Sequence, residues 1–287
     1  MITFFTVPKP FIGSDAIHQR NAIGSWKVSD PGCEVFLFGD EEGVAENAAF
    51  LGARHFAQVN KTTFGTPLLD SVFLQARESA KGTSVCFINA DIIITPAFGK
   101  IVERIQLKDF LAVSCRFDLE YEGALDVTSE TWFQELESLV KIKGKRHPAL
   151  GSDIFLFPKE SRVGSVPPFA VGRKGWDNWM IKDALRRHIP VIDMTPCVTL
   201  VHQNHSYGHV VSRQGRKWAG PESRINTRII ESMGMNTFST PRQATHVLAA
   251  TGLVSSREYW RTRKVPQALA DAARALYWRL RRLCRFQ

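Results

Sequence analysis

Two polar side chains, Asn89 and Asp91, interrupt an otherwise apolar run from residue 84 to residue 94. Side chains alternate between the faces of a strand, so an extended backbone would point both the same way. A carboxylate at the end of a buried strand is costly unless a partner compensates for its desolvation. A divalent cation that bridges phosphates would do so, since hard cations prefer oxygen ligands. The alternative is an aspartate that caps a turn after a core strand.

Further along the chain, acidic and imidazole groups could complete such a site. His202 and His205 follow an apolar stretch and could add metal ligands, although a lone histidine is more often structural. Asp177 stands between Trp176 and Trp179, where it could take a proton from an attacking hydroxyl while the tryptophans stack on sugar rings. An aspartate near a helix start is otherwise most often a cap.

Other charged residues are weaker candidates. Asp153 follows a glycine and a serine at the start of an apolar stretch, and it is a second candidate for contact with a sugar. Lys9, Arg173 and Lys174 could meet phosphates, although each alone is more often a solvated charge.

The elements that must position these groups alternate in the first half of the chain. Apolar runs predict strands at 2–7, 34–40, 54–59 and 85–94, and helical periodicity predicts helices at 15–28, 42–51, 66–80 and 96–105. This alternation predicts a mainly parallel sheet with helices on both faces. Ligands of such sheets bind beyond the carboxyl ends of the strands, where residues 7–8, 39–40 and 89–91 fall.

The second half of the chain is less regular. We expect strands at 110–117, 154–158, 191–193 and 198–201 and helices at 129–141 and 176–187. We expect a catalytic domain over 1–221, with a nucleotide-binding half at about 1–106 and an acceptor half at about 107–221. An extension over 222–287 would end in a basic amphipathic helix at 266–286, which could bind a membrane surface, its own domain or a second subunit.

Composition limits the class of protein. The chain has 287 residues and a formal net charge of +9, which suggests an anionic partner. Its basic tail does not surround a nucleic-acid motif, so nucleic acid is disfavoured. Five scattered cysteines indicate a reducing compartment. No signal peptide or membrane-spanning run is evident, so we expect a cytoplasmic protein, either free or peripheral on the inner membrane face.

Several stretches, taken together, resemble bacterial glycosyltransferases of the GT-A fold, in a group related to family 2. The similarity covers about residues 2 to 210, and the matching stretches are 6–11, 19–23, 38–41, 64–70, 89–92, 172–179 and 202–207. It implies a GT-A-like, Rossmann-type mixed sheet with helices on both faces and a C-terminal helical tail. It also implies a nucleotide-sugar donor, a divalent metal (Mn²⁺ or Mg²⁺) and a glycan or lipid-linked acceptor, as in the synthesis of surface polysaccharide.

The resemblance also implies roles for single residues. The segment with Thr6, Pro8 and Lys9 would lie near the base or ribose, together with Asp40, and Asp70 would contact the donor too. Asn89 and Asp91 would take the metal-motif position, where the stronger motif has aspartate first. Asp177 would be the general base of an inverting enzyme, and His202 would contact the metal or diphosphate. The fold does not fix the stereochemistry.

Two other functions remain open on sequence grounds. A sugar nucleotidyltransferase would need a glycine-rich basic loop after the first strand, and residues 8–13 form a poor one. A non-catalytic module could bind a glycan or a membrane with a decayed site. Retained donor hydrolysis that is lost in Asp91→Ala would exclude this last function.

Overall fold

The computed structural model describes residues 1–204, 220–235 and 239–262. Within these ranges a nine-stranded sheet runs through the molecule in the order β13-β12-β10-β6-β9-β4-β1-β2-β3. Its strands are β1 (Ile2–Thr6), β2 (Glu34–Phe38), β3 (Arg54–Phe56), β4 (Ser84–Ile88), β6 (Leu111–Val113), β9 (Ile154–Pro158), β10 (Val191–Asp193), β12 (His246–Ala249) and β13 (Gly252–Ser255).

Parallel pairing dominates the first half of this sheet. β1 lies between β2 and β4, and β2 pairs with β3, all in parallel. β9 is antiparallel to both β4 and β6, so its first residue lies at the edge where β4 ends. A second sheet of four strands has the order β5-β11-β7-β8, with β5 (Ile92–Ile94), β11 (Leu200–Gln203), β7 (Phe117–Leu119) and β8 (Lys145–Arg146).

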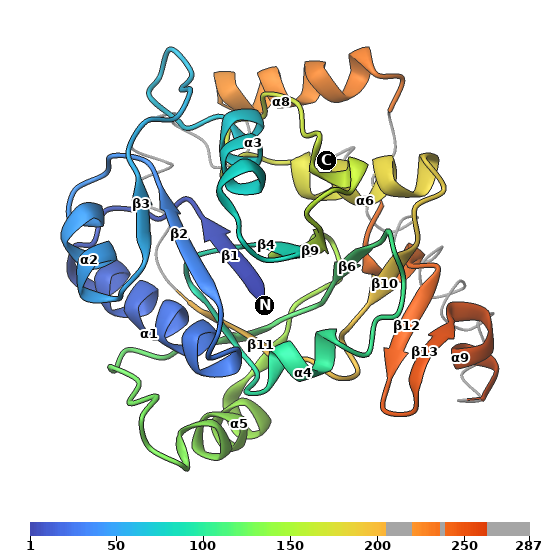
Figure 1. Cartoon of the computed structure of the whole chain (residues 1–287), viewed down its shortest axis with the longest axis horizontal. Helices are drawn as coiled ribbons and strands as arrows, with labels where there is room; N and C mark the ends of the chain where they lie inside the picture. The colour runs from blue at the N-terminus through green and yellow to red at the C-terminus, as the bar shows by residue number, and fades with distance from the viewer. Residues whose placement is uncertain (205–219, 236–238, 263–287) are drawn as a thin grey trace, which may run out of the picture.

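Helices cover both faces of the main sheet (Figure 1). They are α1 (Gly13–Ser29), α2 (Val44–Phe50), α3 (Leu69–Ser79), α4 (Phe98–Val102), α5 (Trp132–Lys143), α6 (Trp176–Arg186), α8 (Pro221–Ser232) and α9 (Ser256–Thr262), with short turns η1 (Arg162–Gly164) and η2 (Pro241–Gln243). Phe4 of β1 packs with α1 and α4 in one apolar core. Phe5 points to the other face and packs with α3 and α6. The predicted α/β class, with a mixed sheet and helices on both faces, is confirmed.

Alternation along β1 explains the two cores. The ring of Phe4 lies 5.9 Å from those of Trp26 and Phe98, whereas the ring of Phe5 lies 4.9 Å from Phe73 and 5.5 Å from Phe87. Burying a phenylalanine stabilises the fold by roughly 1.5–3 kcal/mol. The strand is therefore fixed from both sides, and its carboxyl end at Thr6 is held in a defined place.

Two predicted strands are each divided in the structure. The run 84–94 forms β4 and β5, separated by a turn at Asn89–Asp91 in which the Ile92 amide donates to the Asn89 carbonyl at 3.1 Å. The prediction of one extended strand was therefore wrong, because asparagine and aspartate favour turns over a continuous ladder. In the same way, 110–117 contributes β6 to the main sheet, and β7 begins at Phe117 in the second sheet.

The predicted domain boundary after residue 221 does not divide the structure. β12 pairs in parallel with β10, and β13 pairs with β12, so residues 246–255 belong to the main sheet. The helix expected at 266–286 lies outside the described residues. Within the described part, no helix combines the length and the apolar character needed to cross a membrane.

Candidate active site

The turn between β4 and β5 brings Asn89 to the start of β9. The Asn89 amide donates to the Asp153 carbonyl at 3.0 Å, and its side-chain nitrogen donates to the Asp153 carboxylate at 2.8 Å. This contact exists because β9 runs antiparallel to β4, so that the end of one strand meets the beginning of the other. Two residues that were separate candidates in the sequence are thus direct neighbours.

Asp91 faces His202 across the second sheet. β5 and β11 are antiparallel, with His202 opposite Ile92, the residue that follows Asp91. Nε2 of His202 lies 3.6 Å from Oδ2 of Asp91, and the two side chains are only 5% and 16% exposed. Burial alone would lower the pKa of His202, yet the Asp91 carboxylate outweighs it and raises that pKa.

These two groups fit a pair of ligands to one divalent ion. Metal–ligand distances of about 2.0–2.2 Å place neighbouring ligand atoms roughly 3–3.5 Å apart, close to the observed separation. Among the described residues, no group of three or more His, Cys, Asp or Glu side chains could hold a metal. A site of this kind would take its remaining ligands from phosphates and water, which is the usual arrangement for Mg²⁺.

An arginine whose side chain is 12% exposed lies behind Asp153. Nη1 of Arg116 is 2.6 Å from the Asp153 carboxylate, and its Nε is 3.0 Å from Asp118. Burial opposes a charge here, but the two carboxylates raise the pKa of Arg116. Arg116 therefore stays charged and holds the start of β9 against β7.

Asp118 connects this arginine to two imidazoles. Its carboxylate lies 2.6 Å from Nδ1 of His147 and 3.4 Å from Nδ1 of His202. Burial would raise the pKa of Asp118, but the hydrogen bond with His147 and the charge of Arg116 lower it. A carboxylate on the far nitrogen of a metal-binding histidine orients the ring and fixes its tautomer.

Asp177 lies in the first turn of α6, which follows Gly175 in the left-handed region at φ 101°. A Cβ added to Gly151 would stand 2.1 Å from Oδ2 of Asp177, so the carboxylate packs against that glycine, two residues before Asp153. Burial raises the pKa of Asp177 to about 6, and the charge of Asp153 adds to this effect. The structure thus brings Asp177 to the same edge as Asn89 and Asp153.

The candidates on β1 and the following loop lie at the strand end. Thr6 is buried, and within the described residues its hydroxyl has no hydrogen-bond partner. Pro8 is also buried. Lys9 forms an ion pair with Asp15 of α1 at 3.1 Å, and its amide donates to Gln19.

The remaining donor candidates make local contacts. Asp40 follows β2 and pairs with Lys61, whose hydrogen bond lowers the pKa of Asp40. Asp70 accepts from the amide of Ser71 at 2.8 Å in the first turn of α3. Neither contacts the Asp91–His202 pair through any hydrogen bond or ion pair among the described residues. His205 lies outside the described residues.

The structure corrects the roles expected for the tryptophans. Trp176 is 5% exposed and its ring lies 5.2 Å from Phe87 and 5.1 Å from Phe155, while Trp179 is 3% exposed and packs on Phe169. Both rings belong to the apolar core under α6, so neither offers a face to an acceptor sugar. Their helical spacing, with Met180 and Ala184, was the signal of a buried stripe.

Arg173 is likewise not available to phosphates. It is 8% exposed and forms an ion pair at 2.7 Å with Glu222, the second residue of α8. Lys174 beside it is exposed.

Sequence reasoning missed Arg116, Asp118 and His147. Arg116 and Asp118 lie around the start of β7, and His147 follows β8, 29 residues after Asp118. Only the pairing of β7 with β8 brings them together. No spacing in the sequence could have indicated this contact.

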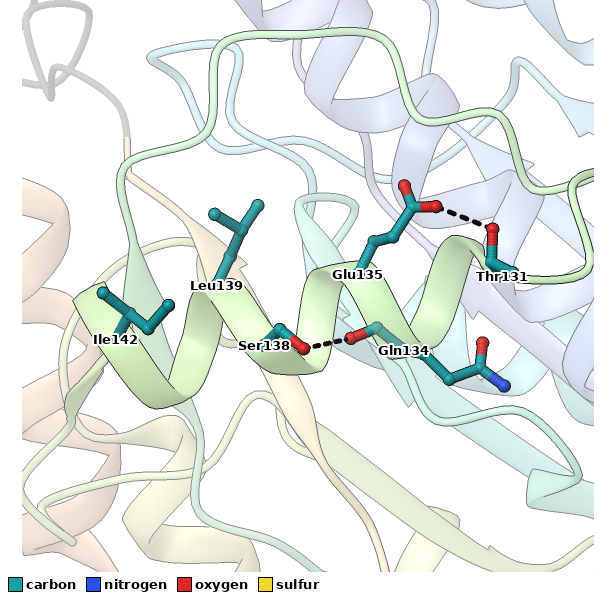
Figure 2. Close-up of a pocket in the computed structure, with 6 residues that line it drawn as sticks. All are labelled: Thr131, Gln134, Glu135, Ser138, Leu139 and Ile142. Atoms are coloured by element: carbon teal, nitrogen blue, oxygen red, sulfur yellow. Dashed lines mark hydrogen bonds between the residues drawn. The ribbon is translucent and has the colours of Figure 1, made fainter.

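A shallow depression elsewhere on the surface is unrelated to this site. It follows the exposed side of α5, where Ser138 and Ile142 are among its lining residues (Figure 2). It contains none of the acidic or imidazole groups described above.

Comparison with protein-family models and with curated proteins gave no match. Among solved structures, the chain is similar to glucosyl-3-phosphoglycerate synthase from Mycobacterium tuberculosis, with 17% identity, a TM-score of 0.47, and coverage of 83% of this chain and 82% of that one. For the same synthase in complex with Mn²⁺ and UDP-glucose, the identity is 14% and the TM-score 0.47, with coverage of 83% of this chain and 80% of that one. For a putative nucleotide-diphospho-sugar transferase from Desulfovibrio desulfuricans G20, the identity is 13% and the TM-score 0.41, with coverage of 81% of this chain and 95% of that one. At these values the likeness assigns no activity or residue role to this protein.

Proposed function

We propose that this protein is a glycosyltransferase that moves a sugar from a nucleotide-sugar donor to a glycan or lipid-linked acceptor, with a divalent metal on the diphosphate. The observation that supports this most is the edge where Asp91 faces His202 while Asp177 packs beside the Asp153 segment. In this proposal Asp91 and His202 are the ligands for the metal diphosphate, and Asp177 is the base, with a pKa that suits this role.

At the donor end, Asp91 and His202 would hold Mn²⁺ or Mg²⁺. The ion, when bound, neutralises charge that develops on the leaving diphosphate. Asn89, whose side chain is bonded to Asp153, contributes by fixing the turn rather than by adding a charge. The neutral asparagine makes the protein part of the site less anionic, so tight binding of the metal would require the diphosphate.

At the acceptor end, Asp177 would take the proton of the attacking hydroxyl if the anomeric configuration inverts. A pKa of about 6 suits this role, because the carboxylate is ionised at neutral pH yet is a stronger base than an ordinary aspartate. The intermediate burial of Asp177 at the start of α6 supports this role, because part of the residue is accessible to an acceptor.

The donor would extend along the carboxyl edge of the main sheet. We propose contacts from Thr6, Pro8 and Lys9 at the end of β1 and from Asp40 after β2. Asp70 and Asp153 are further proposed contacts. The buried Thr6 hydroxyl supports this arrangement, because a ligand hydroxyl there would give it a partner.

We also propose that the acceptor belongs to a surface polysaccharide and that the basic segment 266–286 attaches the protein to the anionic inner membrane face. The support is the sequence pattern, in which arginines surround a stripe of Leu269, Leu276 and Leu283. Binding of the full chain, compared with a chain ending at residue 262, to vesicles with and without phosphatidylserine tests the membrane contact.

The function is tested first by ligand binding. Thermal unfolding is followed with UDP, GDP, ADP, CDP or dTDP, each with and without Mn²⁺. A ligand at about 100 times its Kd stabilises by about 2.7 kcal/mol, which corresponds to several degrees in Tm. We expect at least one diphosphate to raise Tm only with Mn²⁺ present, and no shift with any of the five contradicts the proposal.

A matched pair of variants locates the binding. Asp91→Asn should abolish the Mn²⁺-dependent shift. Glu137→Gln should keep it, because Glu137 lies on α5 and its one ion pair among the described residues is with Lys141, at 3.1 Å. Release of the diphosphate from the matching sugar nucleotide, lost in Asp91→Asn, then separates an enzyme from a binding module.

A further inference from the structure

Two buried amides, Gln203 and Asn21, hold the backbone beneath the Asp91–His202 pair. Gln203 follows His202 at the end of β11, and successive strand residues point to opposite faces. Gln203 is 0% exposed and Asn21, on α1, is 4% exposed. A buried amide is costly unless its hydrogen bonds are made, so its partners identify its task.

Gln203 is bonded to Asp91 twice through the same acceptor. Its backbone amide donates to the Asp91 carbonyl at 3.3 Å, and its side-chain nitrogen donates to that carbonyl at 3.1 Å. The same side-chain nitrogen donates to the His18 carbonyl on α1 at 2.8 Å. One strand therefore fixes Asp91 on both sides, with Gln203 on its backbone and His202 facing its carboxylate.

Asn21 fixes Gln203 in turn. Its side-chain nitrogen donates to the Gln203 side-chain oxygen at 2.8 Å and to the Gly123 carbonyl at 2.9 Å. Its side-chain oxygen accepts from the Leu125 amide at 2.8 Å. Both the nitrogen and the oxygen of the Asn21 side chain are therefore hydrogen-bonded. Because the Asn21 nitrogen donates to the Gln203 side-chain oxygen, the Gln203 side-chain nitrogen points to Asp91.

We propose that the Gln203–Asn21 pair positions Asp91 for metal–diphosphate binding, so that both are positioning residues of the proposed transferase. The turn at Asn89–Asp91 is a short break between two sheets, and the Gln203 side chain joins it to the end of β11 and to α1. Without this bond the Asp91 carboxylate would move relative to His202. Groups that orient metal ligands typically change metal affinity by about 10- to 100-fold when they are removed.

The test uses Gln203→Met, which has a similar size but cannot donate to the Asp91 carbonyl. Mn²⁺ is titrated calorimetrically into the full chain with a saturating amount of the diphosphate that gave the Mn²⁺-dependent shift. We expect Mn²⁺ affinity to fall about 10- to 100-fold. Asn21→Leu, which does not touch Asp91, should lower it less, and the two changes together should be less than additive because they act through one contact.

A matched control separates positioning from general destabilisation. Asn226 on α8 is also 0% exposed, and it exchanges hydrogen bonds of 2.9 and 3.1 Å with the Ala170 backbone. Asn226→Leu removes a buried amide of the same kind that does not contact Asp91, so Tm should fall while Mn²⁺ affinity stays within about twofold of wild type.

The outcomes are distinguishable. Wild-type Mn²⁺ affinity in folded Gln203→Met overturns the positioning role and leaves the proposed function intact. Equal losses in Gln203→Met and Asn226→Leu also overturn it, since the effect would then come from stability alone. Absence of Mn²⁺–diphosphate binding in the wild type contradicts both proposals. If Gln203→Met does not fold, Asn21→Leu alone tests the proposal. We then expect Asn21→Leu to lose more Mn²⁺ affinity than Asn226→Leu, and an equal or smaller loss overturns the positioning role.

Discussion

The carboxylate of Asp177 and the α-carbon of Gly151 are in direct contact. A Cβ placed on Gly151 would lie 2.1 Å from Oδ2 of Asp177, far inside any normal separation. The backbone of Gly151 is not left-handed. Glycine is required here because the Asp177 carboxylate leaves no room for a Cβ, and not because of the backbone conformation. The segment before β9 therefore sets the position of the candidate base at the start of α6.

Gly151→Ala should reduce turnover while the fold survives. The added methyl group forces the Asp177 carboxylate to move, and displacements of about 1 Å can cost a factor of roughly 100 in rate. We expect a fall in kcat of that order, measured as diphosphate release. Gly32→Ala is the control, because a Cβ at Gly32 meets nothing within 4 Å. An unchanged kcat in Gly151→Ala would argue against Asp177 as the base.

The pH profile should show an acid limb near pH 6. The pKa of Asp177 is raised to about 6 by burial, with Asp153 adding to the shift, so the carboxylate is protonated below that pH. A general base is active only when it is deprotonated, so kcat should fall by about tenfold per pH unit below 6. A flat profile between pH 5 and 7 would contradict the assignment.

Asp153→Asn tests the cause of that limb. The change removes the neighbouring negative charge, and Arg116, which lies 2.6 Å from Asp153, keeps its positive charge. Loss of the Asp153 charge favours ionised Asp177, so the limb should move to lower pH. If Asp153→Asn stays active and the acid limb of its kcat–pH profile does not move, a group other than Asp177 produces that limb.

The sequence predicted the strand ends better than it predicted the contacts around them. The apolar run before Asn89 predicted a core strand, and the structure has β4 there, with Asn89 and Asp91 in the turn that follows it. The contact of Asp91 with His202 depends on β5 leaving the main sheet to pair with β11. The sequence predicts that Asp91 and His202 could share a metal site. It does not predict the second sheet, because the apolar run 84–94 predicts one continuous strand through the turn.

Other features could not be predicted, for different physical reasons. β12 and β13 have four residues each. Their apolar runs, which include Val247, Leu248 and Val254, are too short to predict that these strands belong to the main sheet. Arg173 resembled a phosphate-binding residue, but its partner Glu222 lies 49 residues away. Contacts of this kind are set by tertiary packing and have no local pattern.

The buried Arg173–Glu222 ion pair should be important for stability. Its atoms are 2.7 Å apart, and the side chains are 8% and 0% exposed. Removal of one partner from a buried pair costs about 3–5 kcal/mol, because the other charge is left unpaired. Glu222→Gln and Arg173→Met should each lower the free energy of unfolding in urea by that order, and the double change by less than their sum.

This pair also predicts a pH dependence of stability. Burial would raise the pKa of Glu222, but hydrogen bonds from Thr62, Thr66 and Arg173 lower it below its usual value. A depressed pKa contributes stability that is present above the unfolded-state pKa and is lost as the pH falls through the folded-state value. Between about pH 5 and 3, the wild type should therefore lose more stability than Glu222→Gln. Parallel losses in the two proteins would rule out Glu222 as a source of the acid sensitivity.

Trp176 should contribute to the core and not to acceptor binding. Its ring packs on Phe87 and Phe155 under α6, next to Asp177 in the chain. Trp176→Ala should lower the free energy of unfolding by about 3–5 kcal/mol. Trp176→Phe, which keeps an aromatic ring there, should lower the free energy of unfolding by less and leave the acceptor KM unchanged. As a control, Trp260→Ala, at a side chain 40% exposed on α9, should cost much less. A raised acceptor KM in stable Trp176→Phe would instead restore a sugar-stacking role, and it would require α6 to expose this ring when the acceptor binds.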